Sequence, residues 1–266
     1  MTHKPENYNQ LIINYVDSYK ILRKTTDFGK IVSENCSNNE WQDRYSMSAS
    51  LLFAACMASE SMLQFLPKTP VGRVDHYSAA NLSRMVIEHC MMLHYLTEDN
   101  LSDDEISLRI LLLHLHDASA RYRLFKGFNA SDEDLDAAIN LALIKGSIDD
   151  VKKIIRDNKL FKSFDQDKKS KMLGGQVLYI NGLRKAAKLI GYKDGEFDSL
   201  YSYLSAYSHG APMSFYRAAL WGVNAIDPAA GQIGVAATAL KVAEWPLAKS
   251  IIRMAKVLDI NPITID

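Results

Sequence analysis

The chain has 266 residues, of which 48% are hydrophobic and 23% charged, and its 31 Lys and Arg balance 31 Asp and Glu. This length and composition can build a large hydrophobic core without a disulfide or metal staple. The formal net charge of zero argues against a broadly basic nucleic-acid-binding surface, because such surfaces gain most of their affinity from neutralised phosphates. A small local basic patch is still compatible with a net charge of zero.

The cysteines and the apolar segments of the chain indicate whether the protein is expected in the cytoplasm, outside the cell or in a membrane. Cys36, Cys56 and Cys90 are far apart and form no C-x-x-C pair, which is typical of a reducing environment. The N-terminus lacks the apolar core of a signal peptide. The most apolar stretch, residues 48–66, contains Glu60 and several serines, which favours a buried helix over a membrane span. The sequence therefore predicts a cytoplasmic protein without a membrane segment.

Helical periodicity dominates the first hundred residues. Apolar and aromatic residues step by three and four, and they predict three long helices over about 6–25, 41–65 and 79–96. The second helix is rich in Ser and Ala, which permit a neighbouring helix to approach closely. Pro67 and Pro70 follow it and are expected to end it.

N-cap signals organise the middle of the chain. The run Ser102-Asp-Asp-Glu is a capping box, and it predicts a fourth long helix that ends near Gly127. Ser131 and Ser147 head shorter, more charged helices. The segment from about 129 to 192 is therefore predicted to be a peripheral helical subregion.

Three further helices are predicted in the last quarter of the chain. The first ends at His209, the second covers about 214–223, and the third covers about 231–258. Pro246 is expected to kink the third helix, because proline removes a backbone donor and clashes with the preceding turn.

The predicted fold class is all-α. No run alternates apolar and polar residues as a half-buried strand would. We predict a helical bundle of long antiparallel helices in a single domain spanning 1–266, with short helices as a peripheral insertion. The core of this bundle is expected from about 6–127 and 195–258.

Three hydrogen-bonding side chains, Tyr201, Ser205 and His209, stand four residues apart, so a helix places them on one stripe. His209 is the only histidine in the second half of the chain, and Gly210 and Pro212 follow it, as at a helix end. Stabilisation of the imidazole by the helix dipole explains its position without any function. Acid–base chemistry explains it equally well.

Arg84 and Glu88 form an i, i+4 pair on the predicted third helix. On a solvated face such a pair contributes only a few tenths of a kcal/mol. The neighbouring residues are apolar on nearly every side, however, which favours a partly buried pair with a fixed structure. If the pair meets His209 across two helices, Glu88 can orient the imidazole and Arg84 can stabilise an anionic oxygen.

Metal-binding patterns are lacking in the sequence. His114 and His116 are two apart, so a helix points them in different directions. Neither Glu-x-x-His nor His-Glu-x-x-His occurs. The sequence therefore predicts no metal site and no cofactor.

The Arg84-x-x-x-Glu88 helix and the later Tyr201-x-x-x-Ser205-x-x-x-His209 helix end together resemble a family of uncharacterised, largely bacterial helical proteins, classed as a domain of unknown function. The resemblance covers roughly residues 41–220. It implies that these five residues form a site, and it implies no particular reaction.

A more distant similarity is to the helical ribonucleases known as HEPN domains. In those proteins a histidine and an arginine cleave RNA without metal, often in a dimer, in toxin–antitoxin or phage-defence systems. Arg84-x4-His89 and Arg109-x4-His114 match their loose R-x(4–6)-H pattern, whereas His209 has no arginine at that spacing.

Two hypotheses about function follow. The first is a metal-independent, RNase-like hydrolase of a defence or toxin system, with RNA as substrate and a homodimer as one form. His209 would be its general acid and base, Glu88 the orienting group and Arg84 the anion stabiliser, while Tyr201 and Ser205 would contact substrate. The second is a non-enzymatic helical module that binds a partner protein or a small ligand, with the Arg, Glu and His network purely structural.

Overall fold

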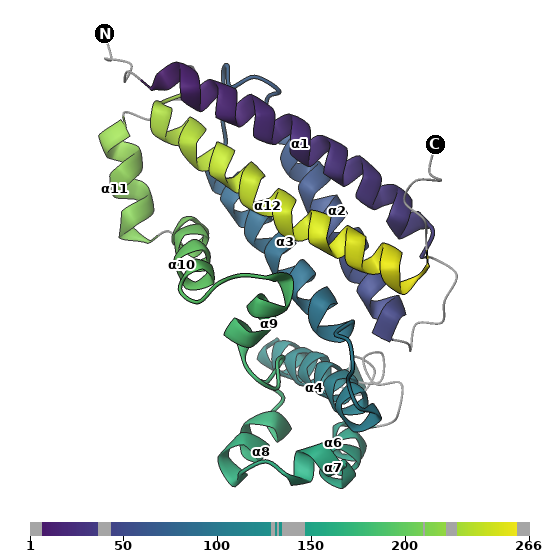
Figure 1. The fold of residues 1–266 in the computed structure, drawn as a ribbon. Helices are drawn as coiled ribbons and strands as arrows, with labels where there is room; N and C mark the ends of the chain where they lie inside the picture. The colour runs from purple at the N-terminus through teal and green to yellow at the C-terminus, as the bar shows by residue number, and fades with distance from the viewer. Residues whose placement is uncertain are drawn as a thin grey trace. The chain divides into compact units, whose positions relative to one another are not determined.

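A computed structural model describes residues 7–36, 44–128, 131, 133–134, 147–209, 211–221 and 228–259. Over these residues the chain forms eleven helices and no strand, so the predicted all-α fold is confirmed (Figure 1). The contacts divide the chain into two compact units, which we call unit 1 (1–97 and 184–266) and unit 2 (98–183).

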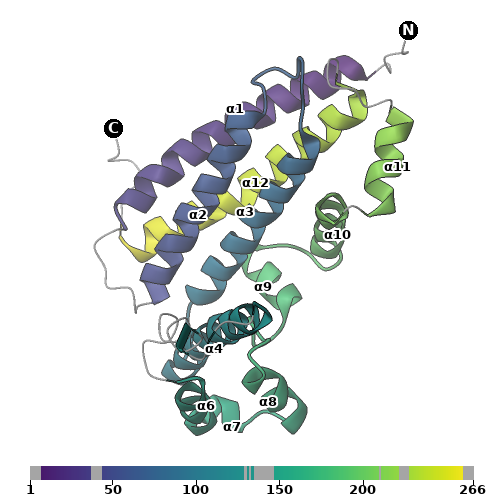
Figure 2. The same ribbon diagram turned by 180° about the vertical axis from the view of Figure 1, so that it is seen from behind.

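Four long helices form the body of unit 1: α1 (Tyr8–Glu34), α2 (Arg44–Phe65), α3 (His76–Leu96) and α12 (Ala230–Val257). α1 packs against α2 and α12, and α3 packs against the same two helices. Successive helices from α1 to α3 run antiparallel, whereas α12 lies beside α1 and runs in the same direction (Figures 1 and 2). All four contribute fully buried side chains, for example Tyr15, Leu52, Met91 and Leu240.

Polar side chains on α1 join it to α2. The Tyr19 hydroxyl donates to the backbone carbonyl of Leu63 at 2.8 Å. The Glu60 carboxylate accepts from Arg23 at 2.7 Å and from Lys30 at 2.6 Å. These two cations lower the pKa of Glu60 to about 2, so its carboxylate stays charged at neutral pH.

Among the described residues, α2 is the one helix that is long and apolar enough to cross a membrane. Of its most apolar 18 residues, 44% are buried within the fold, and α2 contacts α1, α3 and α12. Core helices of soluble proteins have the same composition. These contacts agree with the buried helix that the serines and Glu60 indicated.

Three shorter helices complete unit 1: α9 (Leu183–Ile190), α10 (Glu196–Ser208) and α11 (Pro212–Trp221). α10 packs against α3 through a buried stripe that includes Phe197, Leu204 and Tyr207. Because this stripe faces α3, the next stripe of α10 lies at the edge of the contact between the two helices. That edge carries Tyr201.

Contacts at its two ends hold α11 against α3 and α12. Near its start, the Tyr77 hydroxyl on α3 donates to the carbonyl of Ser214 at 3.4 Å. At its end, the Trp221 ring lies so close to Gly231 of α12 that a Cβ at that position would stand 2.1 Å from the indole. Any side chain at position 231 would therefore displace α11.

Over its described residues, unit 2 contains four helices: α4 (Asp103–Gly127), α6 (Ile148–Asp157), α7 (Lys159–Lys162) and α8 (Gln166–Leu173). Ser102 caps α4 by accepting from the Glu105 amide, and Ser147 forms a capping box with Asp150 on α6. The hydroxyl of Ser131 likewise accepts from a backbone amide three residues on, but the helix predicted after it lies outside the described residues.

α4 contributes a large part of the apolar core of unit 2. Its stripe, including Leu108, Leu112 and Leu115, packs with Val151 of α6 and Phe161 of α7. The peripheral subregion from about 129 to 192 and the core from about 6–127 and 195–258 stay predictions. That the chain forms one domain stays a prediction.

Candidate functional site

Helices α3 and α10 bring together four of the five predicted site residues within unit 1. Arg84 and Glu88 come from α3, Tyr201 comes from α10, and His209 is the residue that caps the C-terminus of α10. Arg84 Nη1 lies 3.2 Å from His209 Nε2, although 125 positions separate the two residues in the sequence.

Arg84 is the centre of this cluster. Its Nε donates to Glu88 Oε1 at 2.8 Å, and its Nη2 donates to the Tyr201 hydroxyl at 2.6 Å. The Tyr201 hydroxyl in turn donates to the same Glu88 oxygen at 2.6 Å. The guanidinium carbon also lies 4.6 Å from the centre of the Tyr201 ring, within cation–π range. Three polar groups and one ring face therefore fix the guanidinium.

The contact with Arg84 fits one tautomer of His209. Arginine has donors only, so a hydrogen bond between Arg84 Nη1 and His209 Nε2 requires Nε2 to accept. In that tautomer Nδ1 carries the ring proton. The lone pair of Nε2 is then directed at a guanidinium.

The partners of Arg84 keep it charged and keep Tyr201 protonated. Partial burial lowers the pKa of Arg84, but the hydrogen bond and negative charge of Glu88 outweigh it, so the pKa lies above its ordinary value. Burial raises the pKa of Tyr201, and the hydrogen bond to Glu88 adds to this effect. At neutral pH the Arg84 side chain is therefore a cation and the Tyr201 side chain a neutral phenol.

Solvent reaches this cluster. The Arg84 side chain is 23% exposed and the Glu88 side chain 41%, and His209 is exposed. A guanidinium has five N–H donors, and the contacts with described residues engage three of them. The other two N–H donors of Arg84 have no partner among these contacts and are available to an acceptor on a ligand.

Ser205 lies one turn before His209 and is partly buried. Its backbone carbonyl accepts from the His209 amide at 3.2 Å, which closes the last turn of α10. None of the contacts of Arg84 and Glu88 described above involves the Ser205 hydroxyl. A substrate contact by that hydroxyl stays a prediction.

The geometry places Glu88 differently from the expected arrangement. Its carboxylate holds Arg84 and Tyr201, and Arg84 is the side chain that contacts His209. Any orienting effect of Glu88 on the imidazole therefore acts through Arg84.

The two R-x4-H matches do not describe this cluster. Arg109 is 3% exposed and lies in unit 2, where Glu98 and Glu105 bind it. His89 is partly buried, and burial lowers its pKa. The histidine that contacts Arg84 is His209, which no local spacing pattern could identify.

Phe197 also supports the site, and the sequence indicated it only as part of an apolar stripe. Its ring centre lies 5.2 Å from that of Tyr201, one turn away on α10, so it limits the movement of the Tyr201 ring. The i, i+4 spacing of two aromatic residues was the available signal.

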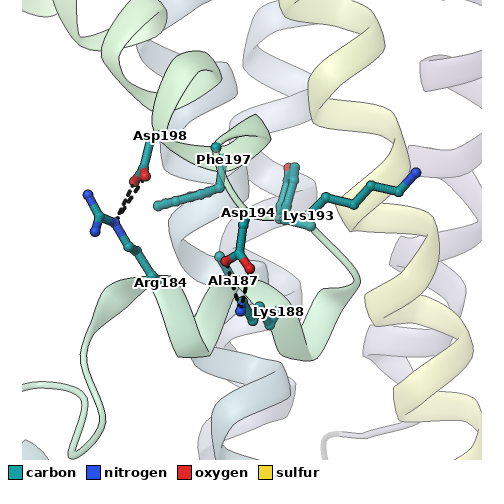
Figure 3. Close-up of a pocket in the computed structure, with 9 residues that line it drawn as sticks. Arg184, Ala187, Lys188, Lys193, Asp194, Phe197 and Asp198 are labelled. Carbon is teal, nitrogen blue, oxygen red and sulfur yellow. Dashed lines mark hydrogen bonds and ion pairs between the residues drawn. The ribbon is translucent and has the colours of Figure 1, made fainter.

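A pocket at the corner between α9 and α10 is also lined by charged residues (Figure 3). Arg184 pairs with Asp198 at 3.0 Å, and Lys188 pairs with Asp194 at 2.8 Å. Both of these cations are therefore already paired with carboxylates, and Lys193 is the third cation in the lining. We therefore place the candidate site at Arg84 and His209.

Over the described residues, no three or more His, Cys, Asp and Glu side chains gather as metal ligands would. That no metal is bound stays a prediction, which rests on the ligand spacing in the sequence.

Comparisons with known proteins give one match. Neither a curated protein nor a solved structure matches the chain significantly. One family model, described as a family of unknown function (DUF5677), matches residues 50–221, a range that includes all five predicted site residues. The chain therefore belongs to the DUF5677 family.

Proposed function

We propose that Arg84, Glu88, Tyr201 and His209 form the active site of a metal-independent, RNase-like hydrolase. The observation that carries the proposal is the 3.2 Å contact between Arg84 Nη1 and His209 Nε2 at a solvent-reached position. This contact pairs a permanent cation with an imidazole. Together the two groups would supply the anion stabilisation and the acid–base catalysis that phosphodiester cleavage needs.

The contact with Arg84 would change when substrate binds. A phosphate oxygen is a stronger acceptor for a guanidinium than an imidazole nitrogen, because its negative charge strengthens the hydrogen bond. A bound phosphodiester would therefore take the Nη1 donor from His209. This exchange would free Nε2 to accept a proton.

The proposed reaction uses the ribose 2′-hydroxyl as nucleophile. His209 Nε2 takes the 2′-hydroxyl proton, the 2′-oxygen bonds to phosphorus, and the bond from phosphorus to the 5′-oxygen breaks. The 5′-oxygen leaves with a proton that the imidazolium returns. The products are a 2′,3′-cyclic phosphate and a 5′-hydroxyl, and Arg84 stabilises the negative charge that builds on the phosphoryl oxygens.

Glu88 and Tyr201 would act by positioning. The Glu88 oxygen accepts from both Arg84 Nε and the Tyr201 hydroxyl, so it fixes the plane of the guanidinium. Catalysis by a charged group depends on such fixation, because a group already in place needs no reorganisation during the reaction. We place the protein in the cytoplasm, in a toxin or defence system that degrades RNA.

RNA cleavage by purified variants tests this function. The wild type is expected to cleave single-stranded RNA in the presence of EDTA. His209→Ala and Arg84→Ala are each expected to slow cleavage by about 10²-fold or more, in line with the loss of a general base or of an anion stabiliser. Arg121→Ala is the matched control, since Arg121 also forms an exposed i, i+4 pair, with Asp117. Equal rates for all four proteins would exclude the proposal.

One observation favours a second candidate function. Arg84, Glu88 and Tyr201 already satisfy one another by three hydrogen bonds. Such a network can serve only to join α3 to α10 in a non-enzymatic module that binds a partner protein or small ligand. This alternative predicts that Arg84→Ala lowers the free energy of unfolding by about 3 kcal/mol, and that the wild type leaves RNA intact.

A further inference from the structure

The outward side of α11 carries large side chains that nothing in the described chain covers. Phe215 is 49% exposed, Tyr216 is 64% exposed and Leu220 is 85% exposed. The inward side is held by the Tyr77–Ser214 hydrogen bond and by Trp221 against Gly231. A helix anchored at both ends therefore displays these side chains to solvent.

Phe215 and Tyr216 form an aromatic pair. Their ring centres lie 4.7 Å apart, with an angle of 50° between the planes. Exposed aromatic rings provide faces on which nucleic-acid bases stack, and such stacking tolerates any base because every base has a π-face.

The charge of α11 suits a polyanion. Arg217 follows the aromatic pair directly, and residues 212–221 contain no Asp or Glu. A surface that combines aromatic rings with arginine and lacks carboxylates is typical of single-strand binding.

The aromatic pair lies within reach of the candidate site. Six positions separate His209 from Phe215, so their Cα atoms are at most about 21 Å apart, given about 3.5 Å per residue in an extended chain. α10 and α11 also contact each other directly. A few nucleotides of single-stranded RNA can span this distance.

We propose that Phe215 and Tyr216 are the base-stacking platform for single-stranded RNA whose backbone is bound at Arg84 and His209. The inference rests on the proposed function and names its substrate class. Stacking would hold the bases next to the cleaved phosphate and would select single-stranded over duplex RNA, because paired bases expose no face.

The test is binding of a fluorescent single-stranded DNA oligonucleotide, which lacks the 2′-hydroxyl and is not cleaved in the proposed reaction. Phe215→Ala and Tyr216→Ala are each expected to raise Kd at least about fivefold, since one stacked base contributes about 1–3 kcal/mol. Tyr216→Phe retains the ring and Leu220→Ala lies outside the platform, so both should stay within about twofold of the wild type.

Two results would overturn the platform. The first is a Kd that is the same for the wild type and for the two alanine variants. The second is a dimeric wild type that becomes monomeric in both Tyr216→Ala and Leu220→Ala. The second result would assign this face to another copy of the chain. Cleavage separates this inference from the proposed function. If RNA cleavage needs His209 but not the rings, only the platform fails; if binding needs the rings while His209→Ala cleaves like the wild type, only the active site fails.

Discussion

A single carboxylate oxygen organises the candidate site. Glu88 Oε1 accepts from Arg84 Nε and from the Tyr201 hydroxyl, and that hydroxyl accepts from Arg84 Nη2. The three groups form a closed triangle in which each fixes the other two. His209 touches the triangle only through Arg84, so its position depends on how firmly the guanidinium is held.

Removing one hydroxyl tests this dependence. Tyr201→Phe deletes two hydrogen bonds of the triangle and keeps the ring beside the guanidinium. We expect it to lower the free energy of unfolding by about 1.5–3 kcal/mol, as for hydrogen bonds to charged groups, and to slow RNA cleavage about tenfold. Urea unfolding and single-turnover cleavage measure the two effects. Tyr122→Phe is the control, because Tyr122 on α4 is 38% exposed and lies outside the triangle. Equal behaviour of the two variants would contradict the account.

Local sequence patterns predict where most helices lie, whereas packing and capping determine where some of them begin and end. α1 was predicted to end near Thr25 but continues to Glu34, because Gly29 and Val32 extend its buried stripe. α3 begins at His76, earlier than predicted, since the Asp75 side chain caps it by accepting from the Ser78 amide. Such caps are visible in a sequence, whereas the helix against which another helix packs is not.

The close packing of α1 against α2 and α12 can be tested at one glycine. A Cβ at Gly29 would lie 2.7 Å from Cys56 Sγ and 3.0 Å from Ile251 Cδ1. Gly29→Ala is therefore expected to lower the free energy of unfolding by about 1–3 kcal/mol through overpacking.

Gly234→Ala on α12 is the matched control for this substitution. The nearest atom to its added Cβ is Leu11 Cδ2 at 4.0 Å, which is ordinary contact. Alanine in a helix interior stabilises it by roughly 0.5–1 kcal/mol relative to glycine. Thermal unfolding measures the stability of both variants. If both substitutions raised stability, or both lowered it, the close packing of α1 would be contradicted.

At the scale of the whole molecule, the sequence predicted the fold class and proposed the site, but it could not show how the site assembles. The all-α class follows from a periodicity that is local to each helix. The contact between Arg84 and His209 joins positions 125 apart, so it depends on how α10 packs on α3. The exposed rings of α11 could not be predicted either, because burial depends on the neighbours of a helix.

Stability of the whole fold is expected to fall in mild acid because of buried histidines. Burial, with the charges of Arg253 and Lys249, lowers the pKa of His94 from 6.5 to about 4. Its neutral form is therefore favoured in the folded state. The resulting stability is fully present above pH 6.5 and is lost as the pH falls toward 4. Burial also lowers the pKa of His76 and His89, which act in the same direction.

Urea unfolding between pH 7 and pH 4.5 measures this effect. The contribution of His94 is on the order of 3 kcal/mol, at 1.36 kcal/mol per pH unit. The His94→Gln variant is expected to lose less stability over this range than the wild type. The pKa of Glu60, about 2 in the folded state, leaves this carboxylate largely charged throughout the range. Parallel pH profiles for the two proteins would show that His94 is not held neutral by the fold.

The most direct test of the central claim, that Arg84 and His209 cleave RNA, uses a DNA oligonucleotide with one ribonucleotide at a defined position. With EDTA present, the wild type is expected to cut it once, after the ribose, and to leave a 2′,3′-cyclic phosphate. His209→Ala is expected to leave the oligonucleotide intact over the same period. An oligonucleotide that the wild type does not cut, or that His209→Ala cuts at the same rate, would contradict the account.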